Sequence, residues 1–146
     1  MKFEKAQAHH HEIFKPLFWQ QWELELHQDG GTYATFNTAN DPSVNLYILI
    51  DDDNTTLLGT VAISKCDIPA KKQYTPWMSY VYVMPEHRGR GLVHHIINFC
   101  KSLEPELYLF CRPYLVELYK KAGFKTIDSI GMDHVIMSIM HWSLTQ

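Results

Sequence analysis

The sequence predicts an α/β (α+β) fold formed by a single domain that covers residues 1–146. Short runs rich in β-branched and aromatic residues alternate with segments whose apolar residues recur every three or four positions, which is the pattern of strands and amphipathic helices. A chain of 146 residues has the usual size of one domain, and no linker, repeat or low-complexity segment divides it. The hydrophobic content of 46% and the charged content of 20% are ordinary for a soluble globular protein.

The N-terminal part predicts a short strand and a long amphipathic helix. Phe3–Gln7 is the candidate strand, and Glu12–His27 carries apolar residues near a 3.6-residue period. Pro16 lies inside that pattern, so we expect the helix to start or to kink there. The turn residues Gln28–Gly31 end the helix, and the polar stretch Thr32–Ser43 fits either a second short helix or a loop.

A hairpin is expected next. Val44–Ile50 and Leu57–Lys65 are rich in β-branched residues, and the polar residues Asp51–Thr56 between them predict a turn. Its three aspartates, Asp51–Asp53, predict a solvated turn rather than a metal site, because a calcium loop needs spaced oxygen ligands and a distant bidentate glutamate. Cys66–Thr75 is a connector to the second half of the chain.

The second half alternates strands and helices. Apolar runs closed by turn residues predict the strands, and one-sided apolar periodicity predicts the helices. Gly123 is expected to end the last helix as its C′ residue. In chain order, the expected elements are the strand Trp77–Met84, the helix Gly91–Leu103, the strand Leu107–Cys111, the helix Tyr114–Ala122, and the paired strands Phe124–Ile130 and His134–Trp142.

Composition excludes several classes of function. A net charge of −3 argues against a nucleic-acid-binding protein, which would carry a basic surplus. The cysteines Cys66, Cys100 and Cys111 form no CxxC pair, so we expect no metal site, and a reducing, cytoplasmic setting. The N-terminus lacks the apolar core of a signal peptide, and no apolar run approaches the ~20 residues of a membrane span. His9–His11 predicts a solvated helix start.

One turn has the form of an anion site. Arg88–Gly91 follows the apolar run Val81–Pro85 and precedes the helical pattern Leu92–Ile97. The first amides of a helix point outward and favour negative charge, glycines allow a close approach, and arginines add donors. The turn matches neither the dinucleotide fingerprint, since His94 stands at its third glycine, nor a P-loop. It therefore predicts binding of a phosphate-bearing cofactor.

Two segments carry a resemblance to a known family. Val83–Leu92 resembles the acyl-CoA pyrophosphate-binding signature of the GNAT superfamily of N-acyltransferases, and Glu117–Phe124 resembles its later "LYxKxGF" segment. A helix and a strand separate the two, as in that superfamily, and the resemblance covers about residues 44–140. It implies the GNAT fold, in which a mixed, mainly antiparallel twisted sheet is flanked by helices and two motif strands splay to admit acetyl-CoA.

The resemblance implies an N-acetyltransferase that moves an acetyl group from acetyl-CoA to a primary amine by direct attack in a ternary complex. Tyr119 aligns with the tyrosine that, in many members, protonates the departing thiolate, and a phenol with a free pKa of about 10 is protonated at neutral pH. The residues implied to bind the cofactor are Val81, Tyr82, Val83, Arg88, Gly89, Arg90, Gly91, Leu92, Val93 and Arg112, and no metal is implied.

Three features depart from the family pattern. Val93 stands where the signature ends in a small residue, and Arg112 stands where many members have an asparagine, so Arg112 is either a surface cation or a phosphate ligand. The expected central strand, Trp77–Met84, contains no carboxylate that would serve as general base. The candidates that remain are Tyr80, Tyr82, Glu86, His87 and an ordered water.

The acceptor is expected to be a small-molecule or peptide amine. The aromatic residues Phe14, Phe18, Trp19 and Trp22 are expected mainly in the core, although with Glu23 and Glu25 they would also suit a pocket for a cationic amine. A homodimer is compatible with the apolar strand Val135–Trp142. The alternatives to an enzyme are an acyl-CoA-binding regulator without turnover and an interaction protein on the same fold.

Overall fold

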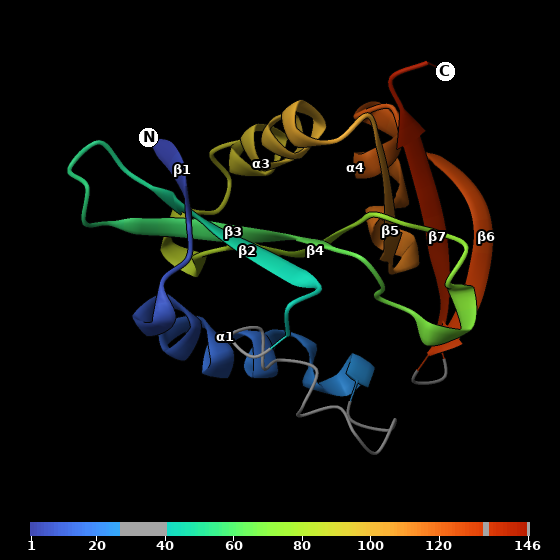
Figure 1. Cartoon of the computed structure of the whole chain (residues 1–146), viewed down its shortest axis with the longest axis horizontal. Coiled ribbons are helices and arrows are strands. Elements are labelled where there is room, and N and C mark those ends of the chain that lie inside the picture. Colours follow the sequence, from blue (N-terminus) through green and yellow to red (C-terminus); the bar gives the residue numbers. More distant parts are fainter. Residues whose placement is uncertain (27–40, 133–134, 146) are drawn as a thin grey trace.

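The computed structural model describes residues 1–26, 41–132 and 135–145, with the side chains of residues 23–26 left out. It has the predicted mixed α/β architecture, built on one seven-stranded sheet (Figure 1). The strands are β1 (Lys2–Lys5), β2 (Val44–Ile50), β3 (Leu57–Ser64), β4 (Trp77–Val83), β5 (Glu106–Cys111), β6 (Lys125–Met132) and β7 (Val135–Ser143), and the α-helices are α1 (Ala8–Leu26), α3 (Leu92–Leu103) and α4 (Val116–Lys121). None of the described helices combines the length and the apolar character needed to cross a membrane.

The sheet is mainly antiparallel, as predicted. Its strand order is β1-β2-β3-β4-β5-β7-β6, and β4 with β5 is its parallel pair. The predicted hairpin is present, with Val44 opposite Ser64 at its open end. β6 forms one edge of the sheet, whereas β7 is paired on both sides, with β5 and with β6.

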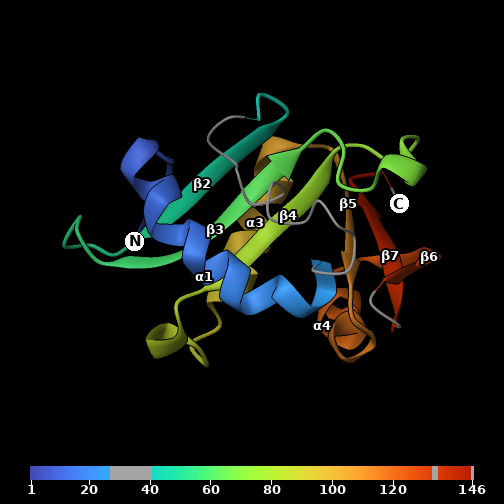
Figure 2. The same cartoon turned by 90° about the horizontal axis from the view of Figure 1, so that it is seen from below.

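Helices cover both faces of the sheet. α1 crosses one face, over β3 and β4, and α3 and α4 lie on the other face (Figures 1 and 2). Because side chains alternate along a strand, β2, β3 and β4 each supply both cores. Phe14 and Phe18 of α1 are buried against Tyr82 on the first face, and Ile96 and Ile97 of α3 are buried on the second. The sequence prediction that the α1 aromatic residues contribute to the core is confirmed for Phe14 and Phe18, which are 0% and 1% exposed.

Two irregularities of β4 position the site. Opposite β3, the register shifts between Thr60 and Ala62, so β4 carries a bulge at Tyr80 and Val81. Tyr80 has a φ of 51°, and its carbonyl accepts a 2.8 Å hydrogen bond from the Thr60 hydroxyl. On its other side, β4 pairs with β5 only at Trp77 and then diverges from it. The predicted splay between the two motif strands is therefore present.

The start of α1 differs from the prediction. The helix begins at Ala8, before Pro16, and continues through that proline, which it accommodates on its exposed side. The amide of Gln7 donates to His10 Nδ1 at 2.9 Å, so the imidazole takes the place of the glutamate in a capping box and fixes the earlier start. His10 is consequently buried rather than solvated, and this burial, aided by His9, lowers its pKa.

The other predicted elements are found with shifted ends. α4 is shorter than expected, because Pro113–Leu115 forms a 3₁₀ turn before it. Gly123 has the expected C′ role, with a φ of 96°. Its amide donates a hydrogen bond to the Lys120 carbonyl, and the amide of Phe124 donates to the Tyr119 carbonyl, which together form a Schellman motif. Phe124 thus belongs to this cap rather than to β6. The predictions for residues 27–40, for His134, and for the side chains of Glu23 and Glu25 lie outside the described residues.

Candidate active site

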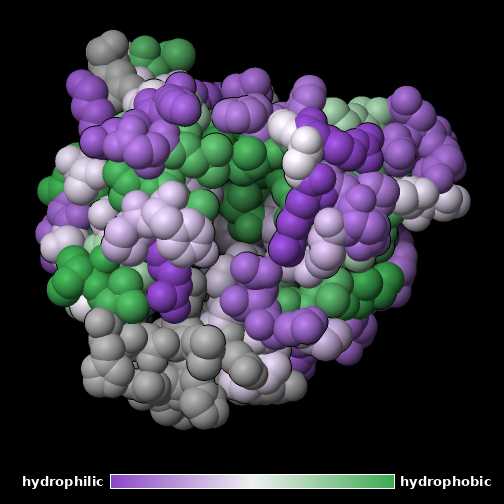
Figure 3. Space-filling view, turned by 180° about the vertical axis from the view of Figure 1, so that it is seen from behind, coloured by the Kyte–Doolittle hydropathy of each residue, from purple (hydrophilic) through white to green (hydrophobic). Residues whose placement is uncertain are grey.

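A cavity of about 350 Å³ opens where β4 leaves β5. Its walls come from β4, the turn after it, the start of α3, the segment around α4, and one residue of α1. The surface seen from behind is hollowed near its middle, with hydrophobic side chains in the hollow and hydrophilic ones around it (Figure 3). The lining residues are Gln21, Val81, Tyr82, Val83, His87, Arg88, Gly89, Gly91, Leu92, Val93, His94, Leu115, Leu118 and Tyr119.

The turn before α3 presents unpaired backbone amides. Gly89 and Gly91 have φ angles of 81° and 73°, a conformation that glycine adopts without strain. A Cβ at either position would meet nothing within 4 Å, so conformation rather than space favours glycine. No side chain caps α3, and within the described residues the amides of Leu92 and Val93 have no acceptor. Such amides, at the positive end of the helix dipole, form an anion site.

The free edge of β4 continues from this turn. Beyond Trp77, no residue of β5 pairs with β4 among the described residues, so the edge that includes Val81 and Val83 faces the cavity. An extended chain containing amide groups would bond to such an edge as an added strand. The two features together suit an elongated ligand with a phosphate group at one end and amides along its length.

The three arginines have different surroundings. The guanidinium of Arg88 lies in the cavity lining, where its Nε donates to the Val83 carbonyl at 2.9 Å and its Nη2 donates to Gln21 Oε1 at 3.3 Å. It also lies 5.4 Å from the centre of the Tyr82 ring. Arg90 turns to His87 Nδ1 at 2.9 Å, and neither Arg90 nor Arg112 lines the cavity. The structure thus brings Arg88, but not Arg90 or Arg112, to the predicted cofactor site.

Tyr119 lies in the wall of the cavity opposite the β4 edge. Its side chain is 6% exposed and packs edge-on against Phe124, with ring centres 5.9 Å apart. Burial, followed by the nearby thiols of Cys111 and Cys100, raises the pKa of Tyr119 well above its ordinary value. The hydroxyl therefore stays protonated at neutral pH and is able to donate.

The candidate proton acceptors named from the sequence separate in the structure. Burial, with the charges of Asp67 and Asp41, raises the pKa of Tyr80, so its phenol does not ionise near neutral pH and is a poor base. Tyr82 is buried among the aromatic residues of α1, and Glu86 is exposed and outside the cavity lining. Among the described residues that the sequence offered as proton acceptors, His87 is the one that both lines the cavity and has a basic side chain.

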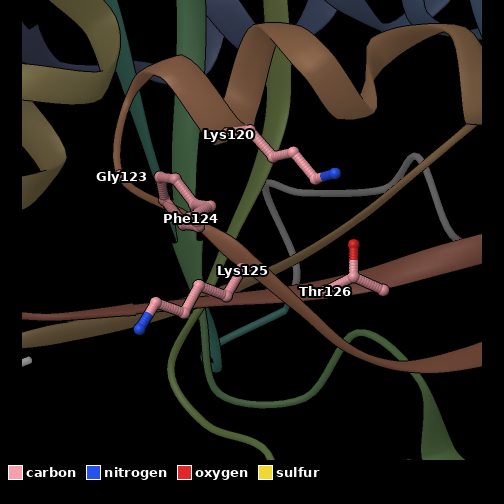
Figure 4. Close-up of a pocket in the computed structure, with 5 residues that line it drawn as sticks. All are labelled: Lys120, Gly123, Phe124, Lys125 and Thr126. Atoms are coloured by element: carbon pink, nitrogen blue, oxygen red, sulfur yellow. The ribbon is translucent and has the colours of Figure 1, made fainter.

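A second depression lies at the other end of α4. It is lined by Lys120, Gly123, Phe124, Lys125 and Thr126 (Figure 4). The ammonium group of Lys120 and the hydroxyl of Thr126 lie on the same side, whereas the ammonium group of Lys125 extends away from them (Figure 4). No helix start is present in its lining, and its two lysines diverge, so it lacks the convergent donors of the cavity at β4.

Some cavity residues lie outside the sequence prediction. Gln21 comes from α1, and Leu115 and Leu118 come from the segment around α4. A signal for Gln21 existed, because it follows Phe18 by three residues and so shares its helix face. His94, which is exposed at the first turn of α3, also lines the cavity.

Comparisons with known proteins agree with this geometry. Residues 11–124 match the family model described as the acetyltransferase (GNAT) family. A spermidine N-acetyltransferase chimera of Vibrio cholerae SpeG and hSSAT has a similar structure, with a TM-score of 0.71 at 15% identity, covering 99% of this chain and 98% of the other. An aminoglycoside 6′-N-acetyltransferase complexed with coenzyme A gives a TM-score of 0.71 at 11% identity, with coverages of 99% and 97%.

A third similar structure is the aminoglycoside 6′-N-acetyltransferase from Enterococcus faecium, with a TM-score of 0.68, 13% identity, and coverages of 99% and 97%. A search of curated proteins found no match. At these identities the structural likeness establishes the fold, and the family model carries the assignment to a family.

Proposed function

The chain belongs to the acetyltransferase (GNAT) family, whose acyl donor is acetyl-CoA, and from this premise we propose that it transfers the acetyl group to the primary amine of a small molecule. The observation that carries the proposal is the junction of two features in one cavity. The uncapped start of α3 supplies amides for a pyrophosphate, and the unpaired edge of β4 runs from it toward Tyr119. Acetyl-CoA has the matching order of groups, with phosphates, an amide-containing arm and a thioester.

Each part of the cavity has a proposed role. The amides from Gly89 to Val93 bind the pyrophosphate, and the backbone groups of Val81 and Val83 orient the pantetheine arm. Arg88 donates a hydrogen bond to the Val83 carbonyl. In the proposal the pantetheine arm replaces Arg88 at this carbonyl, and the released guanidinium then approaches the phosphates. When bound, acetyl-CoA supplies a thioester carbonyl that an amine attacks.

The chemical step depends on the β4 bulge and on Tyr119. At the bulge the strand register shifts, which leaves a backbone amide near Val81 to stabilise negative charge on the thioester oxygen. The hydroxyl of Tyr119 donates its proton to the sulfur as the carbon–sulfur bond breaks. A neutral phenol suits this role because its raised pKa keeps the proton on the hydroxyl, ready for donation, at neutral pH.

The proposed acceptor is a small cationic amine. The aromatic rings of Trp22 and Tyr80, with centres 6.0 Å apart, and the carboxylates near Tyr80 form surroundings that favour a positive charge. The similar structures include enzymes named for spermidine and for aminoglycosides, both of which carry several amino groups. A peptide amine is the second acceptor class, and a screen of both classes separates them.

The test is binding of acetyl-CoA by calorimetry to the wild-type protein and to Gly91→Asp. The φ of 73° is one that aspartate tolerates better than most residues, so the fold should persist. A carboxylate ~4 Å from a phosphate costs about 4 kcal/mol at an effective dielectric constant of 20, so we expect binding to weaken by roughly 100-fold or more. Gly131→Asp, in β6 and away from the cavity, is the matched control and should bind normally.

The outcomes separate the candidate functions. Equal affinity of wild type and Gly91→Asp would contradict the cofactor site. Tight binding of acetyl-CoA, with no release of coenzyme A when any amine of the screen is added, would favour the acyl-CoA-binding regulator. A folded wild-type protein that binds no acetyl-CoA would favour the interaction protein.

A homodimer remains part of the proposal. Both edges of β7 are paired within the sheet, so an interface there would use its faces, including the 64% exposed Ile136.

A further inference from the structure

The connector between β3 and β4 brings a carboxylate to the central strand, which has none of its own. Asp67 lies in that connector, and its Oδ1 accepts a 2.7 Å hydrogen bond from the hydroxyl of Ser64, the last residue of β3. The Ser64 hydroxyl lies 3.3 Å from that of Ser79 on β4, and both hydroxyls act to lower the pKa of Asp67. The three side chains form a polar cluster beside β4.

The position of this cluster along β4 gives it a role. The cavity places the pyrophosphate site at the end of β4 and the pantetheine edge at Val81 and Val83, so a bound arm runs backward along the strand to the bulge. In that direction Tyr80 comes first, and Ser79 follows within about 7 Å of Val81 at ~3.3 Å per residue. The acceptor amine must approach the thioester from the side that the arm does not occupy.

We propose that Asp67, acting through the hydroxyl of Ser79, takes the proton that the acceptor amine loses during transfer. This inference rests on the proposed function and assigns the base that the sequence of β4 lacks. The lone pair of the amine forms the carbon–nitrogen bond, and the carbon–sulfur bond breaks with its electron pair on sulfur. The amine proton passes to Ser79, whose own proton passes to Asp67, and Tyr119 protonates the sulfur.

The surroundings of Asp67 suit a proton acceptor better than a fixed ion pair. Within the described residues, no lysine, arginine or histidine lies within ion-pair distance of it. Burial raises the pKa of Asp67 to about 6, against the hydrogen bonds from Ser64 and Ser79. Tyr80 on β4 and Asp41 before β2 are the titratable groups that share this place, and Tyr80 stays protonated because burial raises its pKa.

The test is the pH profile of kcat/KM in wild type, Asp67→Asn and Ser79→Ala, with acetyl-CoA and spermidine as the probes. We expect the wild-type rate to fall as the pH drops through about 6, because Asp67 becomes protonated and can no longer accept a proton. At pH 8, Asp67→Asn should lower kcat by roughly 100-fold and remove this acidic limb. Ser79→Ala should lower kcat by roughly tenfold or more, and coenzyme A affinity should not change in either variant.

A thermal measurement separates this role from a structural one. Asparagine keeps the oxygen that accepts from Ser64 and removes a buried charge, so Asp67→Asn should melt at the same or a higher temperature than wild type at pH 8. Asp52→Asn, exposed in the hairpin turn, is the matched control and should leave the profile unchanged.

Two results would overturn the inference. If Asp67→Asn retains the wild-type rate or the acidic limb, Asp67 does not receive the proton. If it loses activity only together with a lowered melting temperature, its role is to hold the connector. A wild-type protein that is inactive with spermidine and with every other amine screened would overturn the proposed function and this inference with it, whereas an active wild type with an unchanged variant overturns the inference alone.

Discussion

The two neighbours of β4 contact it in different ways. β3 pairs with it from Ser64 opposite Trp77 to Gly59 opposite Val83, interrupted only by the bulge, whereas β5 pairs with it at a single position, Trp77 with Tyr108. Pairing with β3 continues the sheet, whereas the single pair with β5 leaves the rest of that edge of β4 unpaired among the described residues. An unpaired strand edge is normally a liability, and here the cavity lies along it. The difference shows that the open side is where the fold leaves backbone hydrogen-bonding groups of β4 unpaired.

β4 and β5 diverge on the open side, so other contacts must keep the two halves of the sheet together. Trp77 is fully buried at the last point of contact, with the rings of Tyr108 and Phe110 6.0 Å and 6.2 Å from its own. Farther out, the side chains of Lys71 and Tyr74, from the connector before β4, reach Asp128 on β6. The two halves of the sheet are thus joined by an aromatic cluster and by a polar clamp, and each can be removed separately.

The largest effect is expected from Trp77→Ala. Removing a large aromatic side chain from a packed core costs about 3–5 kcal/mol, and here it also removes the anchor of the one position at which the described residues of β4 and β5 pair. The indole nitrogen has no hydrogen-bond partner among the described residues, so the loss comes from packing. Denaturant unfolding followed by fluorescence measures the free energy of unfolding. Trp19→Ala, half-buried on α1, should cost clearly less, and equal losses would mean that Trp77 has no special place in joining the two halves.

Tyr119→Phe tests the open side for chemistry rather than stability. The packing against Phe124 survives, but the proposed proton donor is lost, so we expect kcat to fall by roughly 100-fold with little change in the affinity for coenzyme A. A donor works while it is protonated. Because burial raises the pKa of Tyr119, the wild-type activity should not be lost through this group until the pH exceeds the ordinary phenol value of about 10. Stopped-flow or steady-state release of coenzyme A measures kcat and its dependence on pH.

The control is Tyr114→Phe, whose side chain is 75% exposed and outside the cavity lining. It should be fully active. If Tyr119→Phe were equally active, the open side of β4 would bind the cofactor without using this phenol, and Tyr119 would be a packing residue.

Local motifs and long-range side-chain contacts around β4 could not be predicted equally well from the sequence. The turn Arg88–Gly91 and the segment around Tyr119 are local patterns, so their place in the fold and in one cavity could be expected from the family resemblance. The destination of an arginine side chain is not local. Arg88 reaches Val83 and Gln21, and Arg90 reaches His87, because those partners are set by how α1 and the turn meet in three dimensions.

Contacts between segments far apart in the chain were the other limit. Asp67 lies in a connector without any recognisable motif, and only the pairing of β3 with β4 brings it to Ser79. The early start of α1 depends on a histidine that acts as a capping residue, which a propensity argument for acidic N3 residues does not reveal. What could be predicted was therefore the order of elements and the motif residues, and what could not was the set of side chains that the folding brings to them.

The smallest effect is expected from Asp128→Asn, which breaks the polar clamp. The Lys71 ammonium group and the Tyr74 hydroxyl each lie 2.9 Å from Asp128 Oδ2, and the bond from Lys71 is the main reason that the pKa of Asp128 falls from 3.8 to about 2. A folded pKa below the unfolded one stabilises the fold above pH 3.8, and this contribution disappears as the pH falls toward 2. Wild type should therefore lose more stability than Asp128→Asn between pH 4 and pH 2.

Unfolding midpoints across this pH range measure the difference. Glu117→Gln is the matched control, because its ion pair with Lys120, at 3.5 Å, is exposed and lies within one helix. It should leave the pH dependence nearly as it is in wild type. If Asp128→Asn behaves like Glu117→Gln, the clamp does not join the two halves of the sheet. The aromatic cluster at Trp77 would then alone hold the open side of β4 in place.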